Sequence, residues 1–176
     1  MKKNKYEVKQ SYVSLYVMFG LLTMITLYFA YVFPKINILF YILSSFFIMG
    51  ITAENKPLAA FITYLCVSAA SLILMPIPYA LPYIALFGHY AIAKYLLERL
   101  KDKAIRFTAK LLYFNAFCAI IYFAVLQTQF LPSEIYSSLP VWALILILQP
   151  CFIIYDILLS VVNRAYAENI KDKITQ

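Results

Sequence analysis

Residues 12–33 read YVSLYVMFGLLTMITLYFAYVF and contain no charged side chain. A helix of about 20 apolar residues crosses the roughly 30 Å hydrocarbon core of a bilayer, and this run of 22 residues is long enough. The apolar segment of a signal peptide is usually about 7–15 residues long, and the run ends in YFAYVFP, without a small-x-small cleavage pattern. We therefore expect a retained first membrane span after the basic start MKKNKYEVKQ.

The composition extends this interpretation to the whole chain of 176 residues. Hydrophobic residues make up 64% and charged residues 13%, whereas soluble domains have about 45–50% and about 25%. Such a chain cannot cover its surface with polar groups, and a membrane span must satisfy its backbone hydrogen bonds internally. We predict an all-α integral membrane protein, a six-transmembrane-helix bundle forming a single domain over residues 1–176. The predicted spans are residues 12–33, 36–53, 57–75, 80–98, 105–127 and 139–163.

Proline residues separate these spans. Pro76 and Pro82, among others, fall at or near predicted span ends, where the missing N–H of proline costs least. Asn55 precedes Pro57 in the short loop after the second span, and asparagine is a favoured N-cap. We therefore expect Asn55 to cap the third span and residues 76–82 to form the turn before the fourth.

Lysine and arginine are unevenly distributed over the predicted loops, and an excess of them marks cytoplasmic loops. With a cytoplasmic N-terminus, 14 of the 15 basic residues fall on the cytoplasmic side, and Lys35 is the exception. We therefore predict a multi-pass protein with both termini in the cytoplasm. Insertion and an anionic leaflet explain the net charge of +7. Binding to nucleic acid would need a soluble basic module, so we predict none.

Four polar residues fall near the middle of predicted spans: His89, Asn115, Gln149 and Asp156. A charged residue at a helix centre costs roughly 2.5–3.5 kcal/mol on insertion scales, so such residues tend to face the bundle interior or a cavity. Gln149 and Asp156 share one stripe of the sixth span because they are seven residues apart. These residues either line a ligand site or form hydrogen bonds between helices.

Charged residues at the end of the fourth span are expected to lie at the lipid headgroups. The i,i+4 spacing of Lys94 with Glu98, and of Glu98 with Asp102, indicates a helix that continues past the membrane edge. Lysine side chains reach the interface by extending their apolar stems along such a helix. We therefore expect Lys94 to be solvated, and we expect His89, about one and a half turns deeper, to face the bundle without Lys94 as a necessary partner.

Signatures of catalysis are sparse. Zinc hydrolysis of the H-E-x-x-H kind needs two histidines, and the chain has one. Cys66, Cys118 and Cys151 are far apart, lie in apolar runs and lack the spacing of metal ligands. We predict no catalytic residues, no metal site and no cofactor. A small membrane enzyme that uses Asp156 and His89 as acid and base remains a minority alternative.

Three segments resemble a set of uncharacterised clostridial-type bacterial membrane proteins: FGHYAIAKYLLERL (87–100), KLLYFNA (110–116) and YDILLSVVNRAY (155–166). These proteins have been loosely associated with the substrate-binding (S) component of energy-coupling-factor vitamin transporters. Six spans in a chain of 20.3 kDa, with polar residues concentrated in the last three spans, also resemble an S component. The resemblance covers most of the chain after residue 57 and implies a location in the bacterial cell membrane.

The resemblance implies a function in the capture of a vitamin or a similar small molecule from outside the cell. Delivery would require a transmembrane coupling subunit and two cytoplasmic ATPases as partners. By position, the resemblance implies a substrate site on spans four to six, formed by Tyr83, His89, Asn115, Tyr122, Gln149 and Asp156. The alternative is a non-catalytic membrane scaffold or accessory protein, which the small number of polar groups favours.

Overall fold

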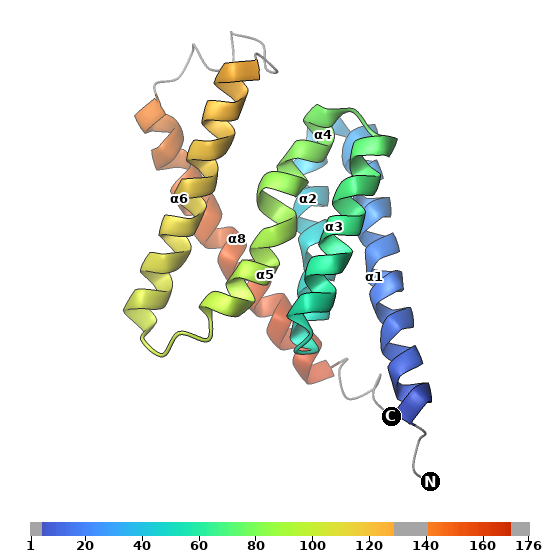
Figure 1. Cartoon of the computed structure of the whole chain (residues 1–176). Helices are drawn as coiled ribbons and strands as arrows, with labels where there is room; N and C mark the ends of the chain where they lie inside the picture. The colour runs from blue at the N-terminus through green and yellow to red at the C-terminus, as the bar shows by residue number, and fades with distance from the viewer. Residues whose placement is uncertain (1–4, 129–140, 170–176) are drawn as a thin grey trace.

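The computed structural model describes the backbone of residues 5–128 and 141–169, and within these ranges the side chains of residues 13–120 and 146–168. All of the described elements are helical (Figure 1), so the predicted all-α class is confirmed. The elements are α1 (Lys5–Val32), η1 (Pro34–Ile36), α2 (Asn37–Ala53), α3 (Pro57–Leu74), α4 (Ile77–Pro82), η2 (Tyr83–Phe87), α5 (Gly88–Leu97), α6 (Lys103–Thr128) and α8 (Val141–Asn169).

Four helical segments are long and apolar enough to cross a membrane: Val13–Val32, Pro34–Ala53, Pro57–Leu74 and Leu146–Glu168. They coincide with the predicted first, second, third and sixth spans. Their outer faces carry large exposed aliphatic side chains, such as Leu21, Leu58 and Ile73. Such a surface suits lipid rather than water as its surroundings. The predicted spans 80–98 and 105–127 correspond to α4–η2–α5 and to α6, which carry more charged residues near one end.

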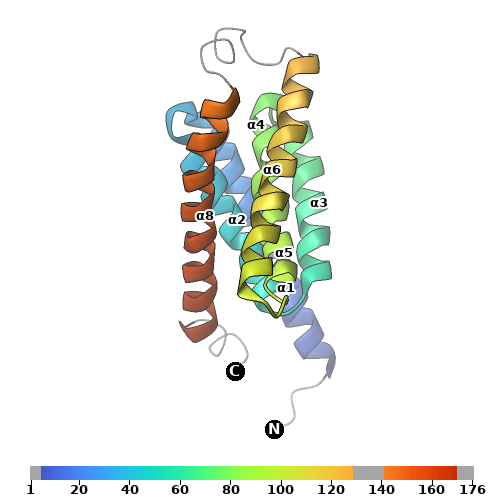
Figure 2. The same ribbon diagram turned by 90° about the vertical axis from the view of Figure 1, so that its left-hand side faces the viewer.

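The helices run alternately up and down, and several charged connections meet at one end of the bundle. The start of α1, the α2–α3 turn, the α5–α6 connection and the end of α8 all lie at the lower end in both views (Figures 1 and 2). Among the described residues, Lys56, Lys101, Lys103 and Arg164 lie at or near this end, which we call the basic end. Lys35, in η1, lies at the opposite end.

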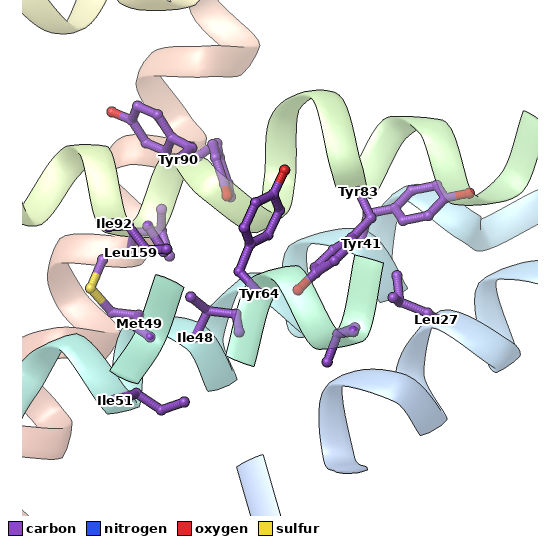
Figure 3. Close-up of a cluster of buried hydrophobic side chains, with 14 of the residues drawn as sticks. Leu27, Tyr41, Ile48, Met49, Ile51, Tyr64, Tyr83, Tyr90, Ile92 and Leu159 are labelled. Carbon is purple, nitrogen blue, oxygen red and sulfur yellow. The ribbon is translucent and has the colours of Figure 1, made fainter. Parts of the chain in front are cut away.

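Helix α2 lies at the centre and packs against α1, α3, α5 and α8. Its buried side chains, such as Ile48 and Ile51, belong to the same hydrophobic cluster as Leu27 of α1 and Leu159 of α8 (Figure 3). Burial of an aliphatic side chain among such neighbours leaves few voids and holds the helices in fixed positions. The cluster therefore provides the frame against which α5 and α8 present their polar side chains.

The turn before the fourth span is shorter than the predicted residues 76–82, because only Met75 and Pro76 separate α3 from α4. Helix α4 begins at Ile77 and continues through a π-helical segment, η2, into α5. In this segment the N–H of Gly88 donates to the carbonyl of Tyr83, five residues back, so the carbonyl of Ile84 loses its helical partner. The hydroxyl of Tyr64 on α3 donates to that carbonyl over 2.8 Å. A side chain from a neighbouring helix thus satisfies the backbone group that the π-helix releases.

Asn55 does not cap α3, because the N-cap residue of α3 is Lys56. Asn55 instead adopts a positive φ of 57° and its N–H donates to the carbonyl of Thr52 over 2.9 Å. This left-handed conformation terminates many helices, and asparagine accepts it more readily than most residues. Asn55 therefore ends α2, and its side-chain oxygen accepts a hydrogen bond from Tyr95 of α5 over 3.0 Å.

Candidate functional site: a polar seam between α5, α6 and α8

Four charged side chains from three helices form a closed ring of ion pairs, which we call the charge square. Nζ of Lys94 and Nζ of Lys110 each lie 3.1 Å from Oε1 of Glu98. Both lysines also contact the carboxylate of Asp156, with Lys110 3.0 Å from Oδ2 and Lys94 paired with Oδ1. Each cation therefore touches both anions, and the ring has no net charge.

Lys94 is the innermost member of the charge square and is completely buried. Besides its two ion pairs, its ammonium group donates to the backbone carbonyl of Asp156 over 2.8 Å and to Oγ of Ser160 over 2.7 Å. The prediction that Lys94 is solvated at the headgroups is therefore wrong. The carboxylate of Asp156, 62 residues further along the chain, holds the ammonium group inside the bundle.

The local spacing of the helices explains how these side chains meet. Tyr90, Lys94 and Glu98 follow one another at steps of four residues, and so do Asp156 and Ser160, so each set lies on one helix face. The hydroxyl of Tyr90 donates to Oδ1 of Asp156 over 2.7 Å. Tyr90 and Lys94 of α5 therefore supply donors to acceptors on the facing stripe of α8.

His89 lies beside this stripe and links α5 to α6. Its Nε2 is 2.7 Å from the carbonyl of Ala85, and its Nδ1 is 3.0 Å from the hydroxyl of Tyr113. A carbonyl oxygen only accepts, so Nε2 carries a hydrogen and the Tyr113 hydroxyl donates to Nδ1 of the neutral ring. The ring of Phe117 covers the imidazole with the centroids 4.2 Å apart. The structure thus places His89 with Tyr113 and Phe117, while Asp156 belongs to the charge square.

A second polar layer joins α6 to α8. Nε2 of Gln149 donates to Oδ1 of Asn115 over 2.6 Å, and Nδ2 of Asn115 donates to the carbonyl of Leu111 over 2.9 Å. Gln149 and Asp156 are seven residues apart, so the layer lies about 10 Å from the charge square along α8. Stacked rings of Phe114 and Phe152, with centroids 4.1 Å apart, pack α6 against α8 as well. We call this whole contact between α5, α6 and α8 the polar seam.

Replacing Gln149 with leucine is expected to weaken the polar seam only slightly. Hydrogen bonds between membrane helices average about 0.6 kcal/mol and reach about 1.7 kcal/mol, and Asn115 keeps its bond to Leu111. Thermal unfolding in detergent should therefore show a small destabilisation for Gln149→Leu. A loss as large as that expected below for Lys94 would contradict the pairing as described.

Two predicted site residues stand apart from the polar seam. Tyr83 is fully buried, its ring centroid lies 6.0 Å from that of Tyr64, and it belongs to the central cluster (Figure 3). Its hydroxyl has no hydrogen-bond partner within the described part of the chain. The side chain of Tyr122 lies outside the described residues, although its backbone belongs to α6. The seam therefore contains four of the six predicted residues, His89, Asn115, Gln149 and Asp156.

The sequence interpretation missed Lys94, Glu98 and Lys110 as members of the site. Two features of the sequence could have indicated them. Tyr90, Lys94 and Glu98 are spaced four residues apart and so share one helix face, and a charged Asp156 in the middle of a span needs a cationic partner. Over the described ranges 5–128 and 141–169, no group of three or more histidine, cysteine and acidic side chains is arranged to hold a metal ion. The described polar groups of the seam are ammonium, carboxylate, amide, imidazole, phenol and hydroxyl groups.

Comparisons with protein family models, with curated proteins and with solved structures found no match to this chain. The function is therefore inferred from the chemistry of the polar seam.

Proposed function

We propose that this chain crosses the membrane six times and is the substrate-binding subunit of an uptake transporter for a small, vitamin-like molecule. The observation that carries the proposal is that polar residues from three helices, separate in sequence, meet at one seam inside an apolar bundle. Ion pairs, hydrogen bonds and ring contacts join α6 to α5 and α8 there. Separation of α6 from its neighbours would present these groups to a ligand, and we assign no catalytic step to them.

Both termini are proposed to lie in the cytoplasm of a bacterial cell. The basic end supports this orientation, because it holds the start of α1 and the end of α8 together with Lys56, Lys101 and Lys103, and cytoplasmic loops carry an excess of basic residues. The α4–η2–α5 run and α6 complete the six proposed crossings.

Accessibility labelling tests this orientation. In a variant without native cysteines, a cysteine at Lys101 should react with a membrane-impermeant thiol reagent only after the cells are opened. A cysteine at Lys35, at the opposite end, should react in intact cells. Labelling of position 101 in intact cells would contradict the proposed orientation, and labelling of both positions from the same side would contradict the six crossings.

Ligand binding is expected to raise the thermal unfolding temperature of the purified protein. We would screen a panel of water-soluble vitamins against the chain in lipid nanodiscs and identify co-purifying small molecules by mass spectrometry. Stabilisation by one compound should be lost in Gln149→Leu and His89→Phe, because both substitutions remove polar groups of the seam. It should persist in Leu112→Ala, which alters an exposed side chain of α6. Equal responses from all variants would exclude the seam as the site.

The proposed transporter also needs a transmembrane coupling subunit and ATPases as partners. Affinity purification from membranes, after chemical crosslinking, should recover an ATPase pair together with the chain. Recovery of a stable partner without ATPases would favour an accessory role instead.

A specific observation favours that second candidate, a membrane scaffold. An apolar groove of about 470 Å³ runs between α1 and α3 and is lined by residues such as Gly20, Met24, Thr63 and Cys66. Small residues allow the close approach of a partner helix in membranes. If a helix fills the groove in cells, Cys66 should react with a membrane-permeant thiol reagent more slowly in native membranes than in nanodiscs of the same lipids. Cys151, which is exposed on α8, is the control.

A further inference from the structure

The members of the charge square differ in how deeply they are buried. The side chain of Lys94 is 0% exposed and that of Lys110 is 9% exposed, whereas those of Asp156 and Glu98 are 19% and 31% exposed. The two ammonium groups therefore lie inside, and Glu98 is the outermost of the four. Glu98 is also the residue after α5, at the start of the α5–α6 connection on the basic end.

The two carboxylates are held very differently. Asp156 accepts hydrogen bonds from Tyr90, Lys94 and Lys110, and its backbone lies in the middle of α8. The carboxylate of Glu98 contacts only the two lysines within the described part of the chain, through the single oxygen Oε1. Rotation of Glu98 toward solvent would break these two ion pairs. The carboxylate of Asp156, in contrast, is held by three side chains.

Departure of Glu98 would leave two buried ammonium groups facing one carboxylate. An uncompensated charge in such a site is strongly unfavourable, so the vacated position would select a group with one negative charge. Oε1 of Glu98 lies 3.1 Å from both Nζ atoms, which shows that one oxygen there can bridge the two lysines. Charge-assisted hydrogen bonds of this kind are among the stronger ones in proteins.

We propose that Lys94 and Lys110 form a binding site for an oxyanion, a carboxylate or a phosphate, and that Glu98 occupies this site in the ligand-free state. The proposal rests on the proposed binding function and narrows its substrate class to molecules that carry an oxyanion group. The oxyanion belongs either to a dissolved molecule or to the headgroup of an anionic phospholipid. In both cases it replaces Glu98 and restores the neutrality of the ring.

The test compares inorganic phosphate binding by the full chain and by Glu98→Gln, using isothermal titration calorimetry in detergent. Glu98→Gln removes the competing carboxylate and should bind phosphate at least about tenfold more tightly than the unaltered protein, a difference of about 1.4 kcal/mol. Glu98→Gln combined with Lys110→Met should return to the affinity of the unaltered protein, because one ammonium group is lost. Glu168→Gln, which removes an exposed charge elsewhere on α8, should change nothing. Equal phosphate affinities for the unaltered protein and Glu98→Gln would overturn the proposal for dissolved anions.

A second experiment tests whether the oxyanion belongs to a phospholipid headgroup rather than to a dissolved molecule. Native mass spectrometry of Glu98→Gln from nanodiscs that contain phosphatidylglycerol should show one more retained lipid than from phosphatidylcholine nanodiscs if the headgroup is the ligand. Failure in both experiments would overturn the site, while the vitamin screen and the seam variants test the proposed function separately.

If Glu98→Gln is too unstable to purify, Glu98→Ala offers the same test by chemical rescue. Recovery of monodisperse Glu98→Ala in sodium acetate, but not in sodium chloride of the same ionic strength, would support the proposal. Equal recovery in the two salts would contradict it.

Discussion

Replacement of Lys94 with methionine is expected to destabilise the folded chain by about 3–5 kcal/mol, because removal of one partner of a buried ion pair leaves the other charge uncompensated. Methionine retains the length and the apolar stem of lysine, so the change is mainly one of charge. Asp156 and Glu98 would then face the single cation Lys110. Chemical unfolding in mixed detergent micelles, followed by tryptophan or tyrosine fluorescence, would measure the loss.

A second substitution separates charge from packing. Lys94→Met combined with Asp156→Asn leaves one cation, Lys110, and one anion, Glu98, so the ring is neutral again. The double variant should therefore be more stable than the sum of the two single effects predicts, because residues in one ion-pair network are energetically coupled and the double change leaves no uncompensated charge. Lys101→Met, which changes an exposed lysine, should lie within about 0.5 kcal/mol of the unaltered protein. Additive single effects would show that Lys94 acts through its stem alone.

The residues of the site that could be predicted from sequence are the polar ones whose placement inside an apolar span costs free energy. An asparagine, a glutamine or an aspartate inside an apolar span needs a partner wherever it lies, so Asn115, Gln149 and Asp156 were recognisable without any tertiary information. The structure pairs two of them directly, Asn115 with Gln149. Helix phase also placed Gln149 and Asp156 on one face, which is the face that α8 presents to the polar seam.

The lysines were misjudged because the sequence does not reveal what covers a helix end. A lysine four residues from the end of a span normally extends to the headgroups, and this is what the spacing of Lys94 and Glu98 indicated. The deciding partner, Asp156, is 62 residues further along the chain. Only the packing of α8 beside α5 turns an apparently solvated lysine into a buried one.

In the fold, too, some features could be predicted from the sequence and others could not. Hydrophobicity and length predicted the four segments that could cross a membrane. The first three predicted spans agree with these segments to within about two residues, whereas the sixth, predicted as 139–163, corresponds to Leu146–Glu168. The π-helical segment η2 was not predicted, because Pro76 and Pro82 resemble the two ends of a turn. In the structure Pro82 instead ends α4 without breaking the helical run, and the hydroxyl of Tyr64 on α3 donates to the carbonyl of Ile84 in η2.

Gly88 lies where two tyrosine rings pack closely against the backbone, so a larger residue is expected to be poorly tolerated there. The hydroxyl of Tyr64 donates to the carbonyl of Ile84, and the ring of Tyr64 packs closely against Gly88. A Cβ atom at position 88 would be 2.7 Å from Cδ2 of Tyr64 and 2.8 Å from Cζ of Tyr83. Both rings are fully or nearly buried, so neither has free space into which it can rotate.

Gly88→Ala is therefore expected to destabilise the chain by about 1–3 kcal/mol, the usual effect of overpacking a well-packed core. Gly20→Ala is the matched control, because the same change in α1 places Cβ 3.2 Å from the single methyl carbon Cγ2 of Thr63, and both variants gain the same helix propensity. Thermal unfolding in detergent should rank Gly88→Ala well below Gly20→Ala. Tyr64→Leu, which removes the ring, should be less harmful in the Gly88→Ala background than alone, because the clash with Tyr64 is then relieved, while the clash with Tyr83 remains and the hydrogen bond is lost in both. Equal stability of the two glycine variants would mean that α3 and η2 are not in the close contact on which the arrangement of α5 depends.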